Sequence, residues 1–150
     1  MSRVFCISCA SALLLLATGC ETGRHGAMGF RLPGYGDPER GKIAFAALEC
    51  NSCHEVAGSD LPKPTLQPKV PFLLGGEVAH EMTDGYLVTS IIHPSHQLKG
   101  YPKEMVANGT QSRMPVYADN MTVKQLTDIV AFLQSRYKVS RPLGEYRSSL

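Results

Sequence analysis

Residues 48–58, LECNSCHEVAG, contain the feature that most constrains this chain. Cys50 and Cys53 are three positions apart, and His54 follows the second cysteine directly. A CxxC pair of this kind can serve a zinc site, a redox disulfide or the covalent attachment of a haem. The remainder of the chain, whose 150 residues are enough for one domain, separates these three uses.

The N-terminal segment has the pattern of a secretory signal. A positively charged start at Arg3 precedes an uncharged run from Val4 to Ala17, which is too short to cross a bilayer as a helix. The run ends in LATGC, which resembles the lipobox of bacterial lipoproteins, although Ala17 stands where Leu is usual. We therefore expect a signal peptide at 1–19 and lipidation of Cys20. The alternative is an ordinary signal cut near Gly19 that leaves Cys20 as a free thiol.

Export and composition indicate that Cys50 and Cys53 have a specific role in the folded domain. A lipidated exported chain belongs in the bacterial periplasm, anchored to a membrane, where unused thiols are a liability. Of the five cysteines, Cys6 and Cys9 lie inside the signal, so only Cys50 and Cys53 remain for the domain. The net charge of +2, without a run of basic residues, gives no footprint for nucleic-acid binding.

Covalent haem attachment needs only the residues that are present. A structural zinc site needs four ligands, and the chain has no second cysteine pair, although His80, His93 and His96 could be recruited. A thioredoxin-like pair needs a βαβ context, which the pattern does not show. On a helical turn, positions i, i+3 and i+4 share one face, so Cys50, Cys53 and His54 would point together. CxxCH in an exported chain indicates one covalently bound haem c with its iron.

Helix signals predict an all-α domain. Asp37 as N-cap, Pro38 and Glu39 begin a first helix that is expected to deliver Cys50 near its end. A second helix should begin at Thr83 or Asp84 and stop before Pro94. Thr122 and Gln125 form a capping box for the last helix, with Met121 and Leu126 as its hydrophobic staple. Its apolar stripe is predicted as Val123, Leu126, Ile129, Val130, Leu133 and Tyr137.

The segments between these helices are read as connections. Residues 20–36 hold five glycines and should form a flexible tether. Residues 60–76 and most of the stretch from Gly100 to Pro115 are expected to be loop. The all-α domain should span 37–138, and 139–150 should be a C-terminal tail.

Together these pieces resemble a small class I c-type cytochrome. The resemblance covers residues 37–138, and it includes Gly41, Phe45, the CNSCH motif, Met114-Pro115 and the closing AFLQS. It implies that the first and last helices cross near Gly41, with Phe45 and Phe132 in the crossing, around one covalently bound haem. His93 departs from the family pattern, which often has Asp or Asn before that proline.

The sixth iron ligand has to come from a segment well removed from His54. Met114 lies 60 residues beyond it, in a loop that Pro115 biases to an extended conformation, and the resemblance also selects this Met-Pro pair. Met121 and Met82 have alternative roles in a staple and a core. The other candidates are Met105, His80, His93 and His96, or an open site.

The resemblance also suggests residues around the haem. The carbonyl of Pro64, in a Pro-x-Leu loop with Leu66, would accept the Nδ1 proton of His54, and Tyr101 and Arg113 would contact the propionates. With His54 and Met114 both bound, the iron has no free position, which favours one-electron transfer over catalysis. We therefore expect no enzyme but a membrane-tethered carrier, or a subunit of a respiratory or dehydrogenase complex, that exchanges electrons with redox partner proteins in the periplasm or membrane. The alternative is a haem-based sensor or peroxidase-like enzyme with an open or displaceable axial site.

Overall fold

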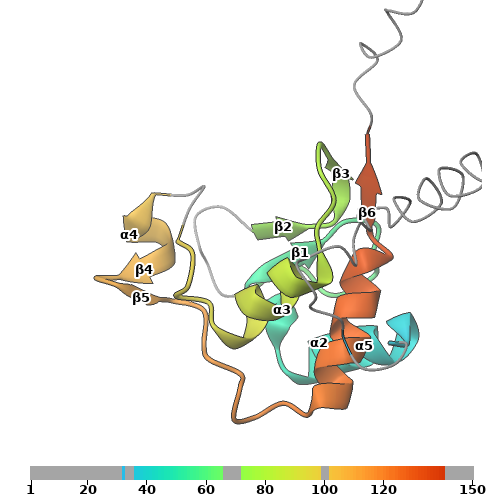
Figure 1. The fold of residues 1–150 in the computed structure, drawn as a ribbon, viewed down its shortest axis with the longest axis horizontal. Coiled ribbons are helices and arrows are strands. Elements are labelled where there is room, and N and C mark those ends of the chain that lie inside the picture. The colour runs from blue at the N-terminus through green and yellow to red at the C-terminus, as the bar shows by residue number, and fades with distance from the viewer. Residues whose placement is uncertain (1–31, 33–35, 66–71, 99–101, 141–150) are drawn as a thin grey trace, which may run out of the picture.

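The computed structural model describes residues 32, 36–65, 72–98 and 102–140. In chain order its elements are α2 (Pro38–Ala47), the 3₁₀ turn η2 (Cys50–Ser52), β1 (His54–Val56), β2 (Phe72–Leu74), β3 (Gly76–Val78), α3 (Asp84–Ile92), α4 (Lys103–Val106), β4 (Ala107–Asn108), β5 (Gln111–Ser112), α5 (Val123–Gln134) and β6 (Tyr137–Val139). Figure 1 shows α2 and α5 side by side, with α3 between them and the projecting unit of α4, β4 and β5. In this part of the chain, no helix is long and apolar enough to span a membrane.

The three main helices begin where their capping residues predict. The Asp37 side chain accepts hydrogen bonds from the backbone amides of Glu39 and Arg40, at 2.9 and 3.0 Å, and Pro38 takes the first helical position of α2. Thr83 caps α3 in the same way. Thr122 and Gln125 form the predicted capping box of α5. At each helix start a capping side chain accepts a hydrogen bond from a backbone amide two or three residues later. Such short-range contacts explain why these three helix starts could be predicted from the sequence.

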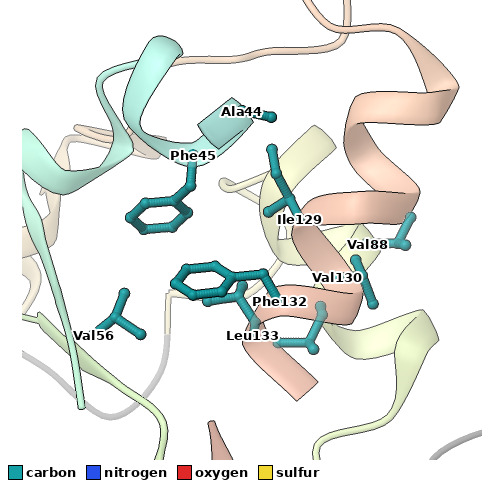
Figure 2. Packing of buried hydrophobic residues seen from close by; sticks show 9 residues of the cluster. Ala44, Phe45, Val56, Val88, Ile129, Val130, Phe132 and Leu133 are labelled. Carbon is teal, nitrogen blue, oxygen red and sulfur yellow. The ribbon is translucent and has the colours of Figure 1, made fainter. Parts of the chain in front are cut away.

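The crossing of α2 and α5 forms the core (Figure 2). The rings of Phe45 and Phe132 meet edge to face, with centroids 5.7 Å apart. Gly41 permits the approach, because a Cβ there would lie 1.9 Å from the carbonyl oxygen of Asp128. The expected crossing near Gly41 is confirmed. The remaining buried apolar residues are Ala44, Val56, Leu87, Val88, Ile129, Val130 and Leu133, with Ala107 buried apart from this cluster.

Two positions of the predicted apolar stripe are wrong. Val123, the first residue of α5, is 63% exposed. Tyr137 lies past the end of the helix, in β6, although it does pack against the core cluster. The fully buried residues of α5 include Phe132, which the predicted stripe lacks, together with Ile129 and Val130.

Short strands complete the helical fold. β1 pairs with β2 and β3 with β6, both in parallel, and β4 with β5 in an antiparallel hairpin. The expected loop at 60–76 thus contains β2 and the start of β3, and the expected loop between Gly100 and Pro115 contains α4 and the hairpin. These elements are only two to four residues long, which is too short to give a periodic pattern in sequence.

Two residues of the predicted tether pack against the folded domain. Leu32 packs against the core cluster. A Cβ at Gly36 would lie 2.2 Å from the carbonyl oxygen of Thr127, so this glycine sits directly against α5. These two residues of the 20–36 segment therefore belong to the packed body. The signal at 1–19, Cys20 and the tail from 141 lie outside the described residues.

Candidate functional site

The CxxCH segment follows a sharp end of the first helix. α2 ends at Ala47 with Leu48 as its C-cap, and Glu49 adopts a left-handed backbone with φ of 57°. The prediction that this helix carries Cys50 near its end is therefore wrong, because a residue in the left-handed region terminates an α-helix. Glu49 has no glycine-like freedom, so this conformation is held by its surroundings.

The two cysteines nevertheless share one side of the chain. Cys50 begins the 3₁₀ turn η2, and the Cys53 amide donates a hydrogen bond to the Cys50 carbonyl at 3.3 Å. A 3₁₀ turn has three residues per turn, so positions i and i+3 are eclipsed. His54, four positions after Cys50, does not share a helical face with the two cysteines as predicted, because it begins the strand β1. The motif is thus a tight turn that leads into a strand.

The environment of Cys50 favours a neutral thiol. Both side chains are free thiols and half-buried. Burial raises the pKa of the Cys50 thiol to about 11, and the nearby Cys53 adds to the increase. Zinc sites and reactive redox cysteines use thiolates. Among the described residues, no group of three or more His, Cys, Asp or Glu side chains is arranged to hold a metal ion.

The imidazole of His54 is held inside the molecule. Parallel pairing places His54 opposite Phe72, and their ring centroids are 5.8 Å apart. Burial lowers the pKa of the imidazole, and the nearby backbone of Phe72 opposes this shift in part. The ring is therefore neutral near pH 7, the form in which imidazole binds metals.

One nitrogen of this ring lacks a hydrogen-bond partner among the described residues. Nδ1 of His54 is buried and makes no hydrogen bond within the described part of the chain. Pro64 is half-buried, but its carbonyl makes no hydrogen bond to this nitrogen in the structure, and Leu66 lies outside the described residues. The role assigned to Pro64 stays a prediction. A buried, unpaired ring nitrogen is costly, and it marks a position that a bound group or a small adjustment has to satisfy.

Met114 and Arg113 follow the β4–β5 hairpin. The Met114 amide donates a hydrogen bond to Ser112 Oγ at 3.0 Å, and its side chain is half-buried. Arg113 is exposed, and its Nε donates to the carbonyl of Ala107 at 3.4 Å. Tyr101, the other predicted propionate contact, lies outside the described residues.

The other candidate ligands lie in different surroundings. Met82 and Met121 pack against the core cluster, which confirms the core role expected of Met82. The staple of Met121 with Leu126 stays a prediction. The rings of His93 and His96 face each other with centroids 5.8 Å apart, and both residues are exposed.

Tyr117 is a site residue that the sequence reasoning missed. Its hydroxyl donates a hydrogen bond to the carbonyl of Leu48 at 3.2 Å, across 69 positions of sequence. Burial raises the pKa of this hydroxyl, and Cys50, Cys53 and Glu49 raise it further, so it lies close to the CxxCH turn. An aromatic residue three positions after Met114 was the available signal. The contact brings the Met114 segment to the Cys50 end of α2.

The residues present fit a covalently attached haem. Two thiols on one side of a tight turn can each form a thioether, and the adjacent neutral imidazole can bind iron. A model of the cytochrome c family matches residues 38–136. The chain belongs to the cytochrome c family. It is a class I c-type cytochrome with a small, mainly helical fold, and its cofactor is haem c, which is covalently bound and contains iron.

Membership of this family also gives the general activity. A cytochrome c transfers electrons through its haem, usually as a carrier between other proteins. No curated protein and no solved structure matches the chain.

Proposed function

We propose that this cytochrome is a lipid-anchored, monohaem electron carrier of the bacterial periplasm. In this proposal Cys50 and Cys53 form the two thioethers, His54 and Met114 bind the iron, and Cys20 carries the lipid. When bound, the haem supplies a one-electron couple between ferric and ferrous iron. Cys50 and Cys53 would attach the haem, and His54 and Met114 would bind its iron.

The CxxCH cluster carries the proposal. Cys50 and Cys53 are half-buried thiols on one tight turn, and His54 beside them is half-buried, with a buried Nδ1 that has no partner among the described residues. Two cysteines and a histidine in CxxCH order on one short segment support covalent attachment of a haem here. Zinc would require four ligands, which these residues do not assemble.

Met114 is the proposed second axial ligand. Support comes from the Tyr117–Leu48 hydrogen bond, which holds the Met114 segment against the chain just before Cys50. The thioether of methionine is a soft ligand that favours ferrous iron, so ligation by His54 and Met114 raises the reduction potential. His54 and Met114 would then both hold the iron, an arrangement that suits electron transfer.

Replacement of the methionine tests this assignment. In Met114→Ala the haem should stay attached, the reduction potential should fall, and the weak long-wavelength absorption of sulfur-ligated ferric haem should vanish. Carbon monoxide should bind the reduced variant, whereas the unaltered protein should resist it. Met82→Ala is the matched control, because Met82 packs against the core and should leave the absorption band unchanged. Avid binding of carbon monoxide by the unaltered protein would favour a sensor or peroxidase-like enzyme instead.

The proposed lipid anchor would hold the protein at a membrane. Support comes from the signal-like segment 1–19 and the LATGC sequence before Cys20. A carrier held at a membrane can exchange electrons with redox partner proteins in the periplasm or in that membrane. Gentle extraction followed by size-exclusion chromatography distinguishes a free carrier, which elutes alone, from a subunit, which elutes with a larger complex.

A further inference from the structure

The loop that carries Met114 has few local constraints of its own. It runs from Arg113 to Thr122 between β5 and α5 and contains no helix or strand. The hairpin holds its beginning through the bond from the Met114 amide to Ser112. The capping box of α5 holds its end. Between these anchors Val116 is 53% exposed, so packing alone does not secure the middle of the loop.

Tyr117 supplies a long-range attachment in the middle of this loop. Its hydroxyl donates to the Leu48 carbonyl at 3.2 Å, and the ring is half-buried. The Asn120 amide donates to the Tyr117 carbonyl at 3.0 Å, which forms a turn and limits the backbone freedom of the tyrosine. The loop is therefore tied at a position only three residues from Met114.

The acceptor of this hydrogen bond lies at the beginning of the CxxCH turn. Leu48 is the C-cap of α2, so its carbonyl is one of the groups that a helix end leaves without an intrahelical partner. The Cys50 thiol is its other described donor, at the long distance of 3.9 Å. A thioether sulfur carries no hydrogen, so attachment of the haem through Cys50 removes that donor. The Tyr117 hydroxyl is then the described side chain that satisfies the Leu48 carbonyl.

We propose that Tyr117 is a positioning residue that holds Met114 in its ligating position by tying its loop to the Cys50 end of the first helix. The inference rests on the proposed role of Met114. One end of the tie lies two residues before the first cysteine, and the other lies three residues after the methionine. The hydroxyl thus couples the segment that attaches the haem to the segment that supplies the second axial ligand.

The expected effect follows from the value of one hydrogen bond. Loss of a partly buried hydrogen bond of this kind changes an equilibrium by about five-fold, within a range of about two- to ten-fold. Because an added ligand can bind the iron only when Met114 has left, its apparent affinity reports the population of the detached loop. Weakening the tie should therefore raise that affinity by the same factor.

The test compares Tyr117→Phe with the unaltered protein, both as haem-loaded ferric full-length chains. Phenylalanine keeps the ring but removes the hydroxyl. Each protein is titrated with imidazole while the sulfur-to-iron absorption is followed. The apparent Kd for imidazole should fall by about five-fold in Tyr117→Phe. The control is Tyr86→Phe, since Tyr86 is 51% exposed on α3, and its Kd should stay unchanged.

A purely structural role gives a different result. If Tyr117→Phe lowers the midpoint of urea unfolding but leaves the imidazole Kd as it was, the hydroxyl stabilises the fold without positioning Met114, and the proposal is overturned. A lower Kd in Tyr86→Phe as well would also overturn it, because the effect would then not depend on the Leu48 contact.

The methionine variant separates this inference from the proposed function. In Met114→Ala, which has no sulfur to displace, imidazole should bind more tightly than in the unaltered protein, and the additional change Tyr117→Phe should leave its Kd unchanged. A persistent effect of Tyr117→Phe in that background refutes action through Met114. If Met114→Ala leaves the absorption spectrum of the protein as it was, Met114 is not the ligand and the proposed function fails at that step.

Discussion

Asp128 gives the most direct test of how the helix crossing is stabilised. Its carboxylate lies on α5 with only 4% of the side chain exposed. It accepts a hydrogen bond from the backbone amide of Asp37 at 2.7 Å and another from Arg40 Nε at 3.2 Å. The ammonium group of Lys124 is its third partner. One buried carboxylate therefore joins the start of α2 to the first half of α5.

These partners determine the ionisation of Asp128. Burial raises the pKa of its carboxyl, but the hydrogen bonds from Lys124, the Asp37 amide and Arg40 outweigh burial and lower the pKa from 3.8 to about 2. A change of this size on folding corresponds to about 2 kcal/mol in favour of the folded state. Arg40 and Lys124 are each 58% exposed, so solvent screening reduces this contribution to about 1–2 kcal/mol.

The direction of the pH dependence follows from the lowered pKa. Because the folded state holds this carboxyl ionised at lower pH than the unfolded state does, the contribution is fully present well above pH 3.8. It is lost as the pH falls through about 2. About half should remain at pH 3. Asp128→Asn should therefore lower the free energy of unfolding by about 1–2 kcal/mol at pH 7 and by about half as much at pH 3.

The measurement is urea unfolding of the haem-loaded protein, followed by far-ultraviolet circular dichroism because the chain contains no Trp. Any change of haem ligation with pH affects the unaltered protein and Asp128→Asn alike, so it cancels in the difference between their free energies of unfolding. Asp119→Asn, at an exposed position before α5, is the matched control and should change little at either pH. An equal loss of stability at pH 7 and pH 3 would refute the electrostatic explanation and attribute the effect of Asp128→Asn to packing.

Three further changes test other parts of the molecule. Gly41→Ala should destabilise the fold by about 2–3 kcal/mol or more, because its Cβ would lie 1.9 Å from the Asp128 carbonyl oxygen and 2.8 Å from the Phe132 Cβ; a loss below about 1 kcal/mol in urea unfolding would contradict the close approach. Replacing both Cys50 and Cys53 by Ser should abolish covalent haem, and a haem-stained band on a denaturing gel would end the thioether assignment. Cys20→Ala should release a soluble protein with an intact haem spectrum, and its retention on membranes after a high-salt wash would indicate an anchor other than lipid.

Local chemistry explains which features could be predicted. Helix starts depend on neighbouring residues, so Asp37 and Thr122 were identified as N-caps from sequence, and the structure confirms both. The start of the second helix, predicted at Thr83 or Asp84, lies at Asp84. The haem c cofactor followed from CxxCH, and the family match supports it. The crossing near Gly41, with Phe45 and Phe132 in it, followed from the resemblance to cytochromes.

Other features depend on residues that are distant in sequence. The left-handed Glu49 ends α2 before Cys50, although glutamate itself favours a helix, so its surroundings override its propensity. Phe72 lies beside His54 only because β1 and β2 pair in parallel across the intervening loop. Strands of three residues carry too little pattern to predict such a pairing.

The sequence by itself determined the attachment motif, the starts of the main helices and the family. Only the tertiary structure decided how the two halves of the proposed site meet. The bond from Tyr117 to Leu48 joins positions 69 residues apart, and the ionisation of Asp128 depends in part on Asp37 and Arg40, about 90 positions earlier. Capping and turn signals act within a few residues, whereas these contacts exist only after α2 and α5 have packed and brought distant segments together.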